Sequence, residues 1–212
     1  MLNVKVMKFG EKELLSVVLK KHNSKDIQMS KALFGAGCFW GVEKKFSELK
    51  GVTSTEVGYS QGITEQTTYE EVCSGNTNHA EVILVSFDES QTTYANLVEF
   101  FFQIHDPTTL NQQGPDRGSQ YRSLIGFYDD SQEKVATEIT KRLNDSQFNQ
   151  KITTVIEPVK NYCPAEEYHQ KYIEKKILLL KCLVLSNRRV WVDDFREKVS
   201  WFFFEVIINK VI

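Results

Sequence analysis

The sequence predicts an α+β fold, a two-layer α/β sandwich built on a mixed sheet. Short β-rich runs alternate along the chain with segments of helical periodicity, as strands and helices do within one domain. No glycine-rich phosphate loop follows any of the runs, which disfavours a doubly wound fold. Residues 58–78 and 107–120 follow neither pattern, and loops of this length in a compact domain are usually functional or disordered.

The first predicted elements are a strand, a helix and a second strand. The apolar run 32–34 stops at Gly35, which predicts a strand that enters a turn. Between residues 39 and 49 apolar residues recur at steps of three and four, so an amphipathic helix follows and ends at Gly51. Residues 82–87 are rich in β-formers and alternate poorly, which indicates a buried strand.

The remaining elements continue the alternation. Residues 94–104 have helical spacing and end at Asp106-Pro107, because the residue before a proline disfavours helix. A strand is expected at 124–128, and a helix with a Ser131 cap follows it. Residues 153–156 predict another strand, and residues 165–175 predict a last helix. The arrangement that we expect is a ferredoxin-like plait with long functional loops.

Three regions differ in composition along the chain. Residues 1–30 are a mixed, charged N-terminal extension, residues 31–176 carry the patterned domain, and residues 177–212 are a hydrophobic C-terminal tail. The tail does not continue the amphipathic pattern. It is an added core element, a partner-binding segment or sequence without an evolved structure, and an exposed β-rich stretch of this kind tends to aggregate.

Bulk composition excludes several classes of protein. The chain has 212 residues and a net charge of −2, from 26 basic and 28 acidic side chains, so it offers no basic field for nucleic acid. Four cysteines are too few for a secreted disulfide scaffold, which favours a cytoplasmic protein. The N-terminus resembles neither a signal peptide nor a transit peptide, and no apolar run is long enough to span a bilayer.

Cys38 lies between the first predicted strand and the helix, in the run Gly-Ala-Gly-Cys-Phe-Trp-Gly. The free N–H groups of a helix start favour an anion, so we expect the thiol pKa to lie below the value of about 8.5 for free cysteine. The alternative is a small buried residue, which is the usual fate of an isolated cysteine. Phe39 and Trp40 are adjacent on the helix and face different directions, so one of them is expected to line a pocket.

Cys38 and several dispersed blocks together resemble the A-type peptide-methionine sulfoxide reductases, which act on (S)-S-oxides. The resemblance runs from about residue 31 to residue 176 and keeps the family's order of motifs. The matching blocks are Gly37–Glu43, Gly58–Gly62, Tyr69–Gly75, His79–Val82, His105–Thr108, Gln113–Ser123 and Ala165–Tyr172.

The resemblance implies a nucleophile and a binding site for the substrate's methyl group. Cys38 would attack the sulfoxide as a soft nucleophile and take its oxygen, leaving a sulfenic acid and methionine. Phe39 and Trp40 would hold the S-methyl group, a role that suits sulfur–aromatic contact. The substrates implied are methionine S-sulfoxide in oxidised proteins or peptides and the free amino acid.

Four further residues receive roles from the resemblance. Glu81 would protonate the sulfoxide oxygen with help from the hydroxyls of Tyr69 and Tyr121, and Asp116 would position the substrate or its water. A carboxyl can donate a proton near neutral pH only if burial raises its pKa, and we predict this for Glu81. Without the resemblance, Glu81 would be a solvated strand residue, the tyrosines half-buried and Asp116 a turn residue.

The chain departs from the family pattern at two loop glycines. Asn78 stands where the family has glycine in Thr-Gly-His-Ala-Glu, and Gln61 stands at the first of two glycines after Gly-Tyr-x. Both positions lie in loops, where asparagine tolerates a positive φ best after glycine. We expect small local changes and no loss of chemistry.

Three other cysteines bear on how Cys38 is regenerated. We expect Cys73 to be buried and inert. Cys182 follows His169 by 13 residues, near the recycling cysteine of many family members, and Cys163 precedes a predicted helix start. Either one would form a disulfide that thioredoxin reduces, provided that the Cα atoms come within about 7 Å. With neither, an external thiol would reduce the sulfenic acid.

No metal or prosthetic group is expected, and we expect a monomer. His79 and Glu81 lack further ligands at metal-site spacing, and His169 is expected to be structural. Two other function classes stay open. A thiol peroxidase or a cysteine hydrolase would use the same nucleophile, the hydrolase with a base near His79. A binding module that has lost activity would use the tail as its partner surface.

Overall fold

The computed structural model describes residues 29–185 and the side chains up to residue 181. A six-stranded sheet has the order β7-β6-β1-β3-β2-β8; its pairs are antiparallel except the parallel pair β6–β7. The strands are β1 Met29–Ala36, β2 Val52–Ser60, β3 Ala80–Asp88, β6 Ser123–Phe127, β7 Val155–Pro158 and β8 Cys163–Pro164. A separate two-stranded ribbon pairs β4 (Gln112–Gln113) with β5 (Asp116–Arg117). The sequence therefore gave the correct mixed α/β class.

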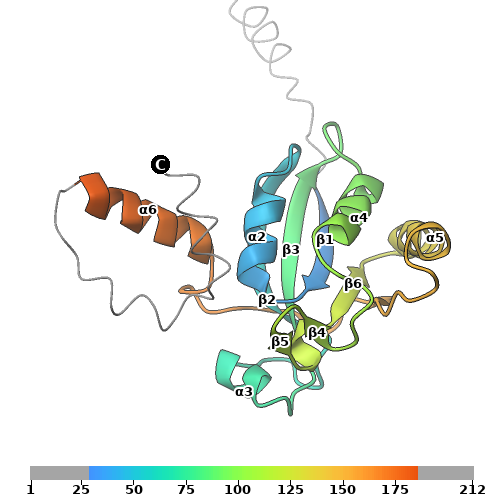
Figure 1. Ribbon diagram of the computed structural model, residues 1–212, viewed down its shortest axis with the longest axis horizontal. Helices are drawn as coiled ribbons and strands as arrows, with labels where there is room; N and C mark the ends of the chain where they lie inside the picture. The colour runs from blue at the N-terminus through green and yellow to red at the C-terminus, as the bar shows by residue number, and fades with distance from the viewer. Residues whose placement is uncertain (1–28, 186–212) are drawn as a thin grey trace, which may run out of the picture. The chain divides into compact units, whose positions relative to one another are not determined.

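Three longer helices supply the second layer, on one face of the sheet (Figure 1). They are α2 (Phe39–Ser47), α4 (Tyr94–Gln103) and α5 (Asp130–Ser146). Short elements lie in the two long loops: α3 (Tyr69–Cys73) and the 3-10 helix η1 (Ser119–Tyr121). The loops thus contain local structure that the sequence pattern did not predict.

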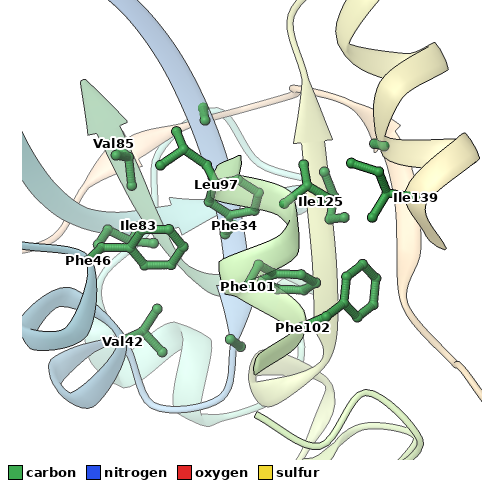
Figure 2. Close-up of a cluster of buried hydrophobic side chains, with 14 of the residues drawn as sticks. Phe34, Val42, Phe46, Ile83, Val85, Leu97, Phe101, Phe102, Ile125 and Ile139 are labelled. Atoms are coloured by element: carbon green, nitrogen blue, oxygen red, sulfur yellow. The ribbon is translucent and has the colours of Figure 1, made fainter. Parts of the chain in front are cut away.

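The main core lies between the sheet and these helices. Because side chains alternate along a strand, Phe34, Ile83 and Ile125 point into this layer, whereas Leu33 packs on the opposite face of the sheet. Phe34 is fully buried and its ring stacks on Phe46 and Phe101, with ring centroids 5.1 and 5.4 Å away (Figure 2). This packing fixes α2 and α4 on β1, the strand that leads into Cys38.

The chain divides into two compact units after Lys171. The second unit contains helix α6 (Tyr172–Leu185), in which Cys182 lies. The expectations for residues 1–28 and 186–212 lie outside the described residues. Within residues 29–185, no helix combines the length and apolar character needed to cross a membrane.

The predicted helix over residues 165–175 is wrong in its first half. Residues 165–171 form loop and turns, and helix begins at Tyr172. Lys171 has a φ of 51°, which interrupts a helix, and the amide of Gln170 bonds to both the N–H and the C=O of Val57 on β2. The segment is therefore held by strand β2 instead of by its own helical bonds.

Two smaller differences have local causes. Helix α5 is capped by Asp129, which accepts from the N–H of Gln132 at 2.9 Å, so the cap lies two residues before the predicted Ser131. Strand β2 was not predicted. Its first half carries polar residues such as Thr53 and Glu56 and is partly exposed, so it lacks the apolar pattern of a strand.

Replacing Phe34 with alanine should lower the free energy of unfolding by about 3–5 kcal/mol, because the substitution removes a fully buried ring and leaves a cavity. Urea denaturation followed by circular dichroism measures the change. The control is Ile63→Ala, at a side chain that is 71% exposed, where the expected change is within about 0.5 kcal/mol. Equal effects of the two substitutions would contradict the assigned core.

Candidate active site

Cys38 lies at the junction of β1 and α2. The strand ends at Ala36, Gly37 turns the chain with a φ of 85°, and Cys38 occupies the N-cap of α2. Its side chain accepts no capping hydrogen bond, but the backbone N–H groups of Trp40 and Gly41 are near enough to lower the pKa of the thiol. The predicted placement of the cysteine at a helix start is confirmed.

Glu81 reaches the same point from the sheet. It is 2% exposed, and its Oε2 accepts the N–H of Phe39, the residue after Cys38, at 3.0 Å. Burial raises the pKa of the Glu81 carboxyl to about 8; the bond from Phe39 lowers it and the charge of Asp116 raises it. Near neutral pH this carboxyl therefore keeps its proton, as predicted from the chemistry that it would perform.

Tyr69, Tyr121 and Asp116 come from α3, η1 and β5 and complete the cluster. Burial raises the pKa of both phenols, and the charges of Glu81 and Cys38 raise it further in each. The charge of Asp116 raises the pKa of Cys38, of Glu81 and of Tyr121. Burial raises the pKa of the Asp116 carboxyl itself. Tertiary structure thus brings together five residues that are separated by up to 83 positions, from 38 to 121.

The predicted low pKa of Cys38 is wrong for the ligand-free protein. Burial and the charge of Glu81 raise the pKa of the Cys38 thiol to about 12, and Asp116 adds to the rise. The N–H groups of Trp40 and Gly41 act in the expected direction but do not offset the burial. Near neutral pH Cys38 is therefore a thiol, and Glu81 lies near enough for its charge to affect the pKa of that thiol.

Phe39 and Trp40 lie beside the thiol in an aromatic cluster. Phe39 is buried with Tyr59, and Trp40 is half-buried at a ring-centroid distance of 6.4 Å from Phe39. Their different exposure agrees with the prediction that adjacent helix positions have different surroundings. The ring of His169 lies 5.1 Å from that of Phe39, 5.5 Å from that of Trp40 and 4.7 Å from that of Tyr69.

His169 fixes the indole of Trp40 through a directional bond. The Nε1–H of Trp40 donates to Nδ1 of His169 at 3.0 Å. Because an indole N–H can only donate, this Nδ1 is unprotonated and the imidazole is neutral. Burial also lowers the pKa of His169, in the same direction. The histidine that was expected to be structural is therefore part of the site's surroundings.

Glu166 is a residue of the site that sequence reasoning missed. Its Oε1 accepts the N–H of Tyr69 at 3.0 Å and its Oε2 accepts the hydroxyl of Tyr59 at 2.9 Å. The carboxylate thereby ties the start of α3 to strand β2. The only sequence feature that pointed to Glu166 was its place in the last matching block. Because a helix was predicted there, no contact between Glu166 and the site was expected.

Both residues that depart from the family pattern have a positive φ. Gln61 has a φ of 65° and Asn78 a φ of 54°, so both accommodate a glycine conformation. His79 is buried and its Nε2 bonds to Thr64 in the loop after Gly62, which gives it a local structural role. Among the described side chains, no group of three His, Cys, Asp or Glu residues could hold a metal ion.

The three other cysteines lie in different surroundings. Cys73 is exposed, so the prediction of a buried thiol is wrong: α3 is a single turn that buries Val72 and leaves its last residue in solvent. Cys163 is 2% exposed and packs in the cluster of Phe39 and Tyr59, and burial raises the pKa of its thiol. Cys182 lies in α6, in the second unit of the chain.

A sulfur nucleophile beside a carboxyl that carries a proton is suited to attack on a polar, oxygen-bearing substrate. The fold and site are therefore those expected of an enzyme that acts through a cysteine. A family model described as peptide methionine sulfoxide reductase matches residues 30–198. The chain belongs to the peptide methionine sulfoxide reductase family, and it is an oxidoreductase that reduces methionine sulfoxide.

Individual relatives agree with this family. Peptide methionine sulfoxide reductase MsrA of Pelagibacter ubique is 52% identical over 148 residues, which are 70% of this chain and 100% of that protein. Methionine sulfoxide reductase A of Corynebacterium diphtheriae has a similar structure, with a TM-score of 0.67 and 39% identity over 69% of this chain and 74% of that one. A structure of Mxr1 from Saccharomyces cerevisiae in complex with Trx2 covers 69% of this chain and 86% of its own, with a TM-score of 0.50 and 28% identity.

Glu81→Gln should become progressively more stable than the wild-type protein as pH rises from about 4.5 to about 8. In this window an unfolded glutamate releases its proton while folded Glu81 retains it, so rising pH favours unfolding of the wild type alone. The difference should reach roughly 5 kcal/mol and then level off, since each pH unit contributes about 1.4 kcal/mol. Urea unfolding at several pH values measures it, with exposed Glu138→Gln as the matched control. A pH-independent difference would show that Glu81 ionises normally.

Proposed function

We propose that the chain reduces the S epimer of methionine sulfoxide, free or in peptides and proteins, by attack of Cys38 on the sulfoxide sulfur with Glu81 as general acid. The observation that carries this proposal is the protonated, buried carboxyl of Glu81, bonded to the N–H next to Cys38. A protonated sulfoxide oxygen makes its sulfur more electrophilic, and the carboxylate that Glu81 then becomes can accept the thiol proton, so that Cys38 attacks as the thiolate.

The proposed reaction conserves its protons. The thiol and the sulfoxide become a sulfenic acid on Cys38 and a thioether; the cysteine sulfur loses two electrons and the methionine sulfur gains them. Glu81 donates its proton to the sulfoxide oxygen and takes up the proton that the Cys38 thiol loses as its sulfur attacks. Tyr69 and Tyr121 donate hydrogen bonds to the same oxygen, and the raised pKa of each phenol keeps its proton in place.

Phe39 and Trp40 bind the S-methyl group in this proposal. Sulfur and methyl groups contact aromatic rings favourably, and the bond from Trp40 to His169 keeps one ring in a fixed orientation. Asp116, whose charge acts on the pKa of both Cys38 and Glu81, orients the substrate or its water. A fixed binding site of this kind reduces the orientational freedom that the reacting atoms would otherwise lose.

Regeneration of the thiol uses a second cysteine. We assign this role to Cys182, because Cys163 is buried in the aromatic cluster and its thiol pKa is raised. The thiol of Cys182 displaces water from the sulfenic acid and forms a disulfide, which a thioredoxin reduces without any prosthetic group. The relative that was solved with Trx2 supports such a reductant.

Several wider features belong to the same proposal. Residues 31–176 form the catalytic domain, between an extension at 1–30 and a hydrophobic tail at 177–212. Strands β6, β1, β3 and β2, adjacent and antiparallel in that order, form a ferredoxin-like plait with α2 and α4. The protein works as a monomer in the cytoplasm, where its few cysteines stay reduced between turnovers.

Glu81→Gln should lower kcat by roughly 100-fold to 10,000-fold, the usual contribution of a general acid, while KM changes little. In the wild type kcat should fall above about pH 8, where Glu81 loses its proton, and this limb should be absent in the variant. Methionine formation from a methionine sulfoxide peptide with dithiothreitol measures both. Cys38→Ser is the inactive reference; reduction by that variant would refute the proposed function.

One turnover without reductant should consume two thiols in the wild type and leave no sulfenic acid. Cys182→Ser should consume one thiol and accumulate a sulfenic acid that dimedone traps, whereas Cys163→Ser should behave as the wild type. Methionine release, thiol titration and mass spectrometry follow the three species. A dimedone adduct in Cys163→Ser and none in Cys182→Ser would assign the role to Cys163 instead.

A further inference from the structure

Gln113 links the turn before Cys38 to the ribbon that carries Asp116. In the small ribbon it lies directly opposite Asp116. Its aliphatic stem also lies on Gly37: a Cβ added to Gly37 would come within 2.6 Å of Cβ and 2.7 Å of Cγ of Gln113. One residue thus contacts the chain immediately before Cys38 and pairs with the strand that carries Asp116.

The amide of Gln113 is held at both of its atoms. Its Nε2 donates to the C=O of Asp106 at 3.0 Å, and its Oε1 accepts the N–H of Asp106 at 3.2 Å. The side chain therefore imitates a paired strand and closes the loop between residues 106 and 113. Because the two bonds need a donor and an acceptor in fixed positions, a carboxylate cannot make both.

The residues around Asp106 are themselves fixed to the main sheet and its helices. His105 bonds through Nδ1 to the C=O of Phe101 at 2.7 Å and through Nε2 to the hydroxyl of Ser123 at 2.8 Å. The C=O of Pro107 accepts from both the N–H and the hydroxyl of Thr153, at 2.8 and 3.0 Å. The amide of Gln113 therefore bonds to a segment that its own hydrogen bonds hold to the rest of the domain.

We propose that Gln113 is a positioning residue, which holds Asp116 at its working distance from Cys38 by joining the ribbon to Asp106 and to Gly37. The inference rests on the roles proposed above for Cys38 and Asp116. In the absence of the amide and stem, the ribbon could move away from the turn, and the substrate would meet a displaced carboxyl. Loss of alignment on the order of 1 Å can reduce a rate about 100-fold.

The same displacement has an electrostatic signature. The charge of Asp116 raises the thiol pKa of Cys38, so withdrawal of this carboxyl should lower that pKa. A residue that merely stabilised the fold would leave the pH profile of thiol alkylation unchanged. Alkylation therefore separates positioning from general stability.

The test compares Gln113→Ala with Gln112→Ala, a neighbour in the same ribbon whose amide bonds to Gly114 and Arg117. Gln113→Ala should lower kcat/KM by roughly 10-fold to 100-fold, mostly through kcat, and move the alkylation profile of Cys38 to lower pH. Gln112→Ala should stay within about twofold of the wild type. Gln113→Met, which keeps the stem and lacks both bonds, serves if the alanine variant does not fold. Wild-type kcat/KM and alkylation profile in Gln113→Ala or Gln113→Met would overturn the inference.

A double-mutant cycle with Asp116→Asn shows whether Gln113 acts through Asp116. In the Asp116→Asn background, Gln113→Ala should cost much less than it does alone, because the carboxylate that it positions is already absent. If Asp116→Asn is impaired and the two effects multiply in full, the inference about Gln113 is wrong while the proposed function stands. Wild-type activity of Asp116→Asn would instead refute the role of Asp116, and with it the basis of the inference.

Discussion

The hydrogen bond from the N–H of Phe39 to the carboxyl of Glu81 is the constraint on which the site depends. Glu81 shares the face of β3 that carries Ile83 and Val85, so it points into the layer where α2 begins. Burial there would be costly for a charged carboxylate, and the group keeps its proton instead. The aromatic core that fixes α2 on the sheet therefore also fixes the acid beside the nucleophile.

The remaining groups reach this point from chain segments with little regular structure. Glu166 ties α3 to the sheet, His169 orients Trp40, and the amide of Gln113 closes the loop that leads to Asp116. Glu166 and Gln113 bond to backbone groups, and His169 accepts the single N–H of the Trp40 indole. Loops held in this way can keep reacting groups in place without the periodic bonds of a helix or strand.

The sequence predicted the parts of the molecule that local pattern determines. The apolar spacing of residues 39–49 and 94–104 places α2 and α4 correctly, because each helix buries one continuous stripe. Strand β2 has polar, partly exposed residues in its first half and gives no such signal. The resemblance of their motifs to the family selected Cys38 and Glu81 as candidate catalytic residues. The pKa of Cys38 depends on how deeply the fold buries it, and no local sequence pattern records that depth. Cys73 was misjudged for a related reason, since α3 is too short to bury its final residue.

The enclosed, protonated state of Cys38 has a consequence for life in an oxidising environment. Hydrogen peroxide and most electrophiles react with the ionised form of a cysteine, so a nucleophile that stays neutral at rest is slow to be damaged by them. In the proposed mechanism a sulfoxide is still attacked, because Glu81 donates the proton that activates it. The raised thiol pKa therefore predicts that Cys38 reacts slowly with such reagents near neutral pH, where its thiolate is scarce.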